Sequence, residues 1–402
     1  MRLVLVTDAS QPAAGDGGLH PVRVIFRQPT EYIVIAHRKW HSVTHEGKFM
    51  FFKELDNESR RRLIDVQQRN EALRAAKSDL THRFTGSMIW KDRGGRDYLY
   101  RRHGRIEKSL GPRSAETEAV YQAYSRGKAL VEQREDGLRK TLEGMARVNR
   151  AMGIGRVPRL VARILRRLDD AGVLGEQVCV VGTNALFAYE AHAGIHFQSG
   201  LLATDDIDFA LDARRNLSLA AKAMPDGLVG LLRKIDPTFA AQVDGHFRAV
   251  NASGLMVDLI TPEPRNRLAV SPRRQRRLGG GTGGGMVEDL EAVEVPRLEM
   301  IVDAPRFTAT AVAEDGLPVW MAVADPRWWA AHKLWLAAEP TREPLKRQRD
   351  RDQGNAVAGM LARAWESVDL SDETLASIPH KMRLELRDAV AAGTEIDDKP
   401  EW

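Results

Sequence analysis

The chain has 402 residues, 43% of them hydrophobic, which is enough to bury more than one apolar core, so two or three domains are expected. Its net charge of +5 allows anionic partners but is too small to indicate nucleic acid by itself. The single cysteine, Cys179, excludes an internal disulfide, and no apolar run approaches the ~20 residues of a membrane span. These features predict a cytoplasmic protein.

The first 49 residues are predicted to be a poorly ordered tail. Gln11–Gly18 is rich in Pro and Gly, which break regular structure. Three histidines repeat every four residues, a spacing that on a helix would form a metal-binding face. No acidic or cysteine ligand accompanies them, so the tail interpretation is preferred. These histidines are His37, His41 and His45.

Two helices and a small sheet are expected next. One helix should run from its cap, Asp56, to about Lys77, and a second from Ser114 to Arg150, because apolar residues recur at helical spacing in both. Three short strand-like runs separate the helices: Ser87–Lys91, Asp97–Arg101 and Arg105–Leu110.

Basic and aromatic residues interleave throughout this sheet. Such a surface can follow phosphates and stack bases, which would make it a contact for nucleic acid. The alternative is a solvated sheet whose aromatic side chains pack on the next helix. The residues concerned are Trp90, Lys91, Arg93, Arg96, Tyr98, Tyr100, Arg101, Arg102, Arg105 and Lys108.

An amphipathic helix at Pro158–Leu168 leads into the central motif of the chain. Val178–Val181 is an apolar, β-branched run of strand length. Gly182 ends this strand in a turn, and Thr183 is expected to cap the helix Asn184–His192 that follows.

The next strand places two carboxylates side by side. Because side chains alternate along a strand, Ile207, Phe209 and Leu211 should enter the core, while Asp206 and Asp208 share the other face. Paired carboxylates repel each other and persist only in water or around a cation. Oxygen ligands of this kind suit magnesium.

A third aspartate interrupts an apolar strand. His246–Val250 and Leu255–Ile260 flank Asn251–Gly254, which is typical of a hairpin turn. Asp258 lies inside the second strand, where a lone charge costs on the order of several kcal/mol unless it is paired. A metal ion is the expected partner.

The stretch Gly279–Gly285 is rich in glycine but is expected to be a flexible linker. A basic loop containing proline precedes it, and no lysine of the P-loop type follows it, although a glycine-rich stretch between a strand and a helix can hold phosphate. Strands are expected at Arg306–Val312 and Pro318–Val323. A helix should begin at Asp325, with proline at its first position.

Charged residues on the C-terminal helices are candidates for phosphate contacts. Lys333 lies among apolar neighbours, so it is either a surface lysine that reaches water or a phosphate ligand. A helix from Glu343 to about Trp365 carries Arg349 and Asp350; helical spacing puts Asp350 on the packed face, with Asp352 as a competing assignment. A last helix is expected over residues 371–391.

These motifs together resemble the nucleotidyltransferase superfamily typified by DNA polymerase β. Its pattern is a strand, a Gly-Ser or Gly-Gly turn, a helix, a strand with two alternate aspartates, and a third aspartate on a later strand. Gly182–Thr183 departs slightly but keeps the hydroxyl, and His192–Leu202 is expected to be an inserted loop. VVGTNALFAYEA, TDDIDF and GLMVDLITPEP further resemble a bacterial nucleotidyltransferase-fold family of unassigned substrate, over about Phe51–Leu361.

The resemblance implies an α+β fold. Its core would be a polymerase β-like palm with a mixed sheet and flanking helices, between an N-terminal region of helices and a small sheet and a C-terminal helical region. The expected division is a tail at 1–49, the basic sheet and its helices at 50–152, the nucleotidyltransferase core at 153–262, an Arg/Gly-rich linker at 263–285, and strands and helices that complete the nucleotide site at 286–402.

The implied activity is magnesium-dependent transfer of a nucleoside monophosphate from an NTP, such as ATP, to an acceptor hydroxyl, releasing pyrophosphate. Asp206 and Asp208 would hold two metals, and Asp258 would complete the metal on the nucleophile side. The residues expected to bind the nucleotide are Gly182, Thr183, Asn184, Lys333, Arg349 and Asp350.

The acceptor is left open by the sequence. It would be a nucleic-acid end such as tRNA, as for toxin-like relatives, a protein side chain or a small molecule. The alternative function is a nucleic-acid-binding protein that works through the basic sheet, with a nucleotidyltransferase core that is inactive or only senses nucleotide.

Overall fold

The computed structural model describes residues 51–212, 214, 223–242, 246–263, 277–278, 289–365 and 368–394. All of them fall within the unit Met50–Trp402. The expected tail with its three histidines and the stretch Gly279–Gly285 lie outside the described residues. None of the helices described is both long enough and apolar enough to cross a membrane.

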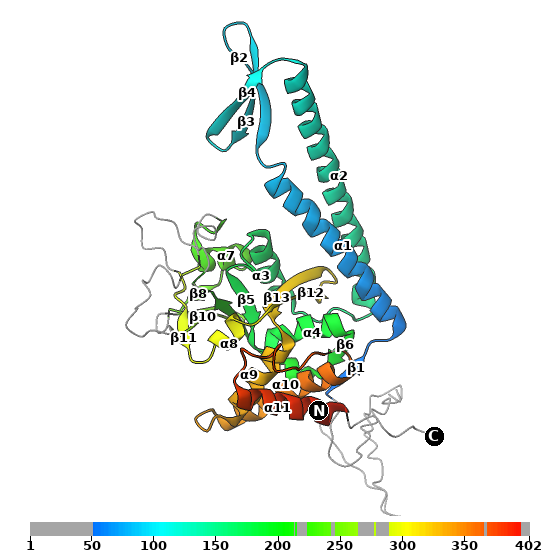
Figure 1. Cartoon of the computed structure of the whole chain (residues 1–402), viewed down its shortest axis with the longest axis vertical. Coiled ribbons are helices and arrows are strands. Elements are labelled where there is room, and N and C mark those ends of the chain that lie inside the picture. The colour runs from blue at the N-terminus through cyan, green and yellow to red at the C-terminus, as the bar shows by residue number, and fades with distance from the viewer. Residues whose placement is uncertain are drawn as a thin grey trace, which may run out of the picture. The chain divides into compact units, whose positions relative to one another are not determined.

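Two long helices flank a small sheet in the chain (Figure 1). α1 (Asn57–His82) begins after Asp56, whose carboxylate accepts a backbone N–H of the first turn, and it runs further than expected. α2 (Ala115–Ala151) begins with a capping box at Ser114. The antiparallel sheet between them, in the order β2-β3-β4, consists of β2 (Ser87–Asp92), β3 (Asp97–His103) and β4 (Ile106–Pro112).

Polar contacts attach α1 to the rest of the unit. Asn70 Nδ2 donates to Thr310 Oγ1 at 3.1 Å in a buried position. Arg74 pairs with Asp169 at 2.9 Å, and its guanidinium lies 3.7 Å from the ring centre of Trp320. The helix that leads to the small sheet is therefore anchored at several points along its length.

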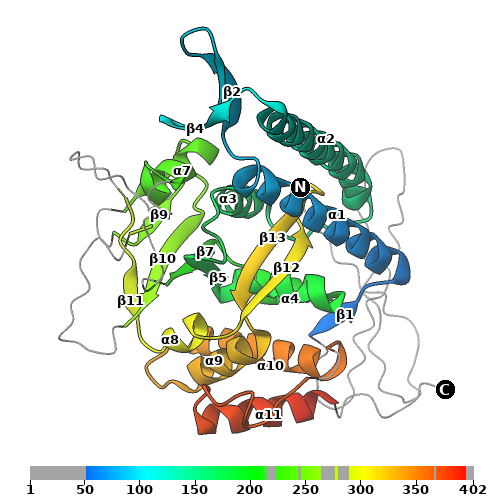
Figure 2. The ribbon, with the colours of Figure 1, turned by 45° about the horizontal axis from the view of Figure 1, so that its top comes forward.

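An eight-stranded mixed sheet forms the centre of the fold (Figure 2). Its strand order is β12-β13-β5-β7-β10-β9-β8, with β11 beside β10. In the middle, β7 (Asp206–Leu211) is antiparallel to β5 (Val178–Val181) and parallel to β10 (Met256–Pro262). The other strands are β8 (Ala240–Ala241), β9 (Arg248–Val250), β11 (Val293–Val295), β12 (Arg306–Val312) and β13 (Pro318–Ala324).

Helices flank this sheet, and the predicted α+β class is confirmed. α9 (Pro326–Ala338) follows β13, and α10 (Pro344–Arg363) packs against both α9 and α11 (His380–Thr394) (Figure 2). The other α-helices in the described part of the chain are α3 (Arg159–Asp170), α4 (Leu186–Ala193), α5 (Ser199–Leu202), α7 (Gly227–Ile235) and α8 (Glu299–Val302).

Two sequence expectations about the fold are wrong. The segment His192–Leu202 is not an irregular insertion, because it contains α5 and strand β6 (Ile195–Phe197), which pairs antiparallel with β1 (Phe52–Glu54). The last helix, α11, begins later than Ser371. Pro379 precedes α11 and disfavours helical backbone at the residue before it, so the helix cannot extend back to Ser371.

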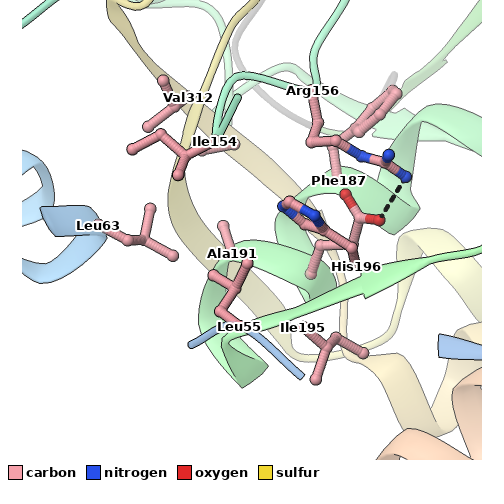
Figure 3. Close-up of a pocket in the computed structure, with 11 residues that line it drawn as sticks. Leu55, Leu63, Ile154, Arg156, Phe187, Ala191, Ile195, His196 and Val312 are labelled. Carbon is pink, nitrogen blue, oxygen red and sulfur yellow. Dashed lines mark hydrogen bonds and ion pairs between the residues drawn. The ribbon is translucent and has the colours of Figure 1, made fainter. Parts of the chain in front are cut away.

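A small cavity of about 20 Å³ is lined by residues of α1, α4, β6 and β12 (Figure 3). On its wall, Arg156 Nη2 donates to Glu190 Oε1 at 3.1 Å, and the same carboxylate oxygen accepts the Phe197 N–H at 2.6 Å. Burial raises the pKa of Glu190 to about 7, against the opposing effect of Arg156. The space holds about one water molecule, so this ion pair ties β6 to the core and does not outline a ligand site.

Candidate active site

Three aspartates lie on one face of the central sheet. In the parallel pair β7–β10, Asp258 is directly opposite Asp208, and Met256 is opposite Asp206. Register partners in neighbouring strands project to the same side, so all three carboxylates share a face. Phe209, which follows Asp208 in sequence, points the other way and is fully buried.

Repulsion among these carboxylates is concentrated on Asp208. Burial raises its pKa to about 7, and the charges of Asp206 and Asp258 add to this effect. Lys333 and Arg248 act in the opposite direction. Because its ionised form is disfavoured in the free protein, Asp208 is the carboxylate that would gain most from a cation.

Asp258 already has an arginine partner, so its charge is balanced without a metal ion, and the expected metal stays a prediction. Arg248 lies opposite Asp258 on β9, and its Nε and Nη2 donate to the two carboxylate oxygens at 2.6 and 2.5 Å. This bidentate pair satisfies the charge that interrupts the apolar strand. Among the described residues, no group of three or more His, Cys, Asp or Glu side chains is arranged to hold a metal ion.

The donor set nevertheless fits magnesium in part. Asp206 and Asp208 offer carboxylate oxygens on one face, the ligand type that magnesium prefers, and a cation would offset the burial and the repulsion that raise the pKa of Asp208. Asp258 meets the same chemical requirement, but both of its oxygens are bound by Arg248. A third carboxylate ligand is therefore available only after that pair opens.

Glycine is required where the chain turns after β5. Gly182 has φ +63°, and a Cβ atom built at this position would lie 2.2 Å from Asp208 Oδ2. The backbone can approach the carboxylate this closely only without a side chain. Trp329 Nε1, on α9, donates to the Gly182 carbonyl oxygen at 3.2 Å and so links the turn to that helix.

Thr183 does not cap the following helix, which corrects an expectation from the sequence. Gly182–Ala185 forms a short 3₁₀ turn before α4, with no capping hydrogen bond from a side chain. Thr183 Oγ1 instead accepts hydrogen bonds from Arg349 Nη2 at 2.9 Å and Gln353 Nε2 at 3.1 Å, both on α10. Its own hydroxyl hydrogen has no acceptor within the described residues and can be donated to an anionic oxygen.

Two buried amide oxygens near this turn have no hydrogen-bond donor in the described part of the chain. Asn184 Nδ2 donates to the Asp206 carbonyl at 2.7 Å, while its Oδ1 is unpaired. Gln353 Nε2 also donates to the Leu201 carbonyl at 2.8 Å, while its Oε1 is unpaired. An unsatisfied buried acceptor costs about 1–3 kcal/mol, which a donor from a ligand or water would offset.

Lys333 lies inside the protein, so the surface-lysine interpretation is wrong. Its side chain is buried, and Nζ donates to Asp350 Oδ1 at 2.8 Å. Arg342 Nε binds the other oxygen of Asp350 at 2.7 Å. Burial lowers the pKa of Lys333, while Asp350 and Asp208 favour its charged form. The competing Asp352 is half-buried and bonds to Gln348, so Asp350 is the carboxylate that faces inward.

Sequence reasoning missed two residues of this network. Arg248 could have been found from the sequence, because a hairpin turn centred near residue 253 puts position 248 opposite Asp258. Gln353 stands four residues after Arg349, so both extend from one face of α10 to Thr183. Helical periodicity was the signal for this second residue.

Comparison with known proteins agrees with this geometry. A family model described as nucleotidyltransferase matches residues 159–378, which is more than half of the chain. The match spans the three aspartates, the turn after β5 and both α9 and α10. Searches of curated proteins and of solved structures gave no match. The chain belongs to this nucleotidyltransferase family.

Proposed function

We propose that this protein transfers a nucleoside monophosphate from an NTP to an acceptor hydroxyl in a magnesium-dependent reaction that releases pyrophosphate. The observation that best supports this proposal is the shared sheet face of Asp206, Asp208 and Asp258, next to the close turn at Gly182. The same order of motifs supports a relationship to the DNA polymerase β-like enzymes. We expect it to act in the cytoplasm, since its single cysteine, Cys179, forms no disulfide.

In this proposal, the aspartates hold the metals. Asp206 and Asp208 are the primary ligands, and Asp258 joins them on the nucleophile side once Arg248 releases it. Magnesium, when bound, supplies the positive charge that stabilises the transferring phosphate and the pyrophosphate leaving group. Arg248 therefore competes with the metal for Asp258 and sets how readily the third ligand becomes available.

The triphosphate lies along the turn and the two helices behind it. The Gly182 backbone admits the phosphates closely, and Thr183 donates its free hydroxyl hydrogen to a phosphate oxygen. Asn184 Oδ1 accepts a donor group of the nucleotide or its waters. Lys333 and Arg349 neutralise charge, with Asp350 holding the lysine in place. A buried lysine held by a carboxylate is already oriented, so little side-chain entropy is lost when it binds phosphate.

The test is transfer itself. The full chain is incubated with magnesium and each α-labelled NTP in turn, together with total tRNA or with a cell lysate, and label in macromolecules and in new small-molecule products is measured. We expect transfer from at least one NTP, abolished in Asp206→Asn and by removal of magnesium. Absence of transfer from all four NTPs to either acceptor pool would refute the proposal.

A second function is favoured by one observation, the bidentate hold of Arg248 on Asp258. If this pair never opens, the core lacks a third metal ligand, so it would bind nucleotide without transferring it. The function of the protein would then be to bind nucleic acid through the small sheet. Wild-type protein that binds nucleic acid and is stabilised by an NTP, yet transfers nothing, would identify this function.

A further inference from the structure

Positive charge is concentrated in two segments, the small sheet and the Arg/Gly-rich stretch 263–285, which carries six Arg and one Glu. Residues 83–113, which contain β2, β3 and β4, carry nine Lys or Arg and three Asp or Glu, a net charge of +6. The complete chain has a net charge of +5, so all other residues together sum to about −1. A polyanion would therefore be attracted to these two segments, of which the small sheet is the one that the structure describes in full.

Strand register divides the sheet into two faces. One face packs on α2, since Trp90 lies against Tyr121 at 5.8 Å between ring centres and Arg101 lies over Tyr124 at 5.2 Å. The residues paired on the opposite side form what we call the outer face. It consists of Ser87, Ile89, Lys91, Tyr98, Tyr100, Arg102, Glu107, Ser109 and Pro112.

Two of the aromatic side chains expected to stack bases, Trp90 and Tyr100, are covered by other side chains, whereas Tyr98 is half-buried on the outer face. Trp90 contacts both Tyr121 and the guanidinium of Arg113, which lies 5.0 Å from its ring centre. Tyr100 is 7% exposed, with Lys91 above its ring at 5.7 Å. The outer face thus presents cations above its aromatic rings, a chemistry that suits phosphates better than bases.

Four arginines at the outer face and its two turns are exposed and take part in no ion pair formed by the described residues. The ion pairs of this sheet are those of Lys91 with Glu107 and of Arg113 with Asp97 and Glu118. The uncommitted arginines are Arg93, Arg96, Arg102 and Arg105. Arg93 lies 5.4 Å from the ring centre of Tyr100, which places it over the outer face.

We propose that the outer face, with Arg93, Arg96, Arg102 and Arg105, binds the phosphate backbone of a nucleic acid that serves as the acceptor. All four cations are arginines, whose planar fork matches phosphate oxygens. At a rise of about 3.3 Å per residue, β3 separates the turns at its two ends by about 20 Å. This length matches the rise of about six base pairs of a duplex. The acceptor role rests on the proposed transferase function; the binding surface does not.

Binding of the full-length protein to a fluorescent RNA hairpin, measured by anisotropy without NTP or magnesium, tests the surface. Four arginine–phosphate contacts predict a slope of about −3 to −4 for log K against log salt, or roughly a hundredfold loss between 50 and 200 mM salt. The double variant Arg93→Gln/Arg102→Gln should reduce the slope by about two and weaken binding at least tenfold at low salt. Arg93→Lys/Arg102→Lys should retain most of the affinity.

The matched control removes two exposed cations elsewhere, Lys140→Gln/Lys381→Gln, whose side chains are 72% and 85% exposed. We expect this control to bind RNA like the wild type. Equal weakening by the control, no loss in the arginine double variant, or binding to phosphatidylserine vesicles without binding to RNA would each overturn the proposal. RNA binding without nucleotidyl transfer would refute the transferase proposal alone, and transfer to a small acceptor without RNA binding would refute this surface alone.

Discussion

Replacing Asp208 by asparagine should stabilise the metal-free protein, and the gain should depend on pH. The folded state raises the pKa of this carboxyl from 3.8 to about 7, through burial and the charges of Asp206 and Asp258. A tenfold change in an acid dissociation constant is worth about 1.36 kcal/mol, so the ionised group destabilises the fold by about 4 kcal/mol. Because the folded state binds the proton more tightly, wild-type stability is lost as pH rises from about 4 to about 7. Asparagine cannot ionise and avoids that loss.

The assay is thermal and urea unfolding of wild type and Asp208→Asn in EDTA, from pH 4 to pH 8. We expect nearly equal stabilities at pH 4 and an advantage for the variant of up to about 4 kcal/mol at pH 8. For a folded region of about 350 residues this corresponds to about 5 °C in melting temperature. Asp352→Asn, which removes a carboxylate outside the network, is the control.

In the second half of the experiment, magnesium and NTP should reduce or reverse the difference in stability between the wild type and Asp208→Asn. They should raise the melting temperature of the wild type at pH 8 and leave Asp208→Asn unchanged, because the variant lacks the charge that binds the cation. A difference between the two proteins that does not vary with pH would show that packing, not charge, is responsible. An equal rise in melting temperature of both proteins with magnesium and NTP would refute the role of Asp208 as a ligand.

Three other changes test separate parts of the structure. Gly182→Ala should destabilise the protein by at least about 1–2 kcal/mol and abolish the magnesium-dependent rise in melting temperature. The reason is that the left-handed backbone disfavours a side chain and the added Cβ meets Asp208. An unchanged melting curve would contradict the close approach of Gly182 to Asp208. Gln353→Leu and Thr183→Val should each weaken NTP affinity, as measured by titration. The double variant should bind NTP no more weakly than Thr183→Val alone, because Gln353 is expected to act by holding the Thr183 hydroxyl. Losses of affinity that add up would mean that Gln353 does not act through this hydroxyl. Glu190→Leu should cost about 1–3 kcal/mol because it removes the acceptor of the buried Phe197 N–H and leaves the half-buried Arg156 guanidinium with only the Phe197 carbonyl, whereas Glu190→Gln keeps an acceptor and should cost less; equal costs in urea unfolding would show that packing dominates there.

Local rules accounted for much of the fold before any tertiary contact was considered. Asp56 was predicted as a helix cap from its side chain and position, and it accepts the expected hydrogen bond. Alternation along β7 was enough to separate Asp206 and Asp208 from the core residue Phe209, which is fully buried. Gly182 was predicted to turn the chain, and its positive φ agrees. These predictions depend on backbone geometry and on neighbours within a few residues, which every sequence contains.

Partners that are distant in the chain were decided only by the tertiary structure. Alternation cannot say that β10 lies parallel to β7 with Asp258 opposite Asp208, because strand pairing brings together residues far apart in sequence. For the same reason, apolar neighbours did not reveal that Lys333 is buried against Asp350.

The physical reason is that burial and pairing are properties of the assembled core. A strand carries its two faces wherever it is placed, so the sequence by itself determined which side chains of β7 belong together. Whether those carboxylates meet an arginine, a lysine or one another depends on which strands and helices pack against that face. Arg248 is therefore a partner of Asp258 that the sequence did not predict, and it lies on the face that Asp258 shares with Asp206 and Asp208.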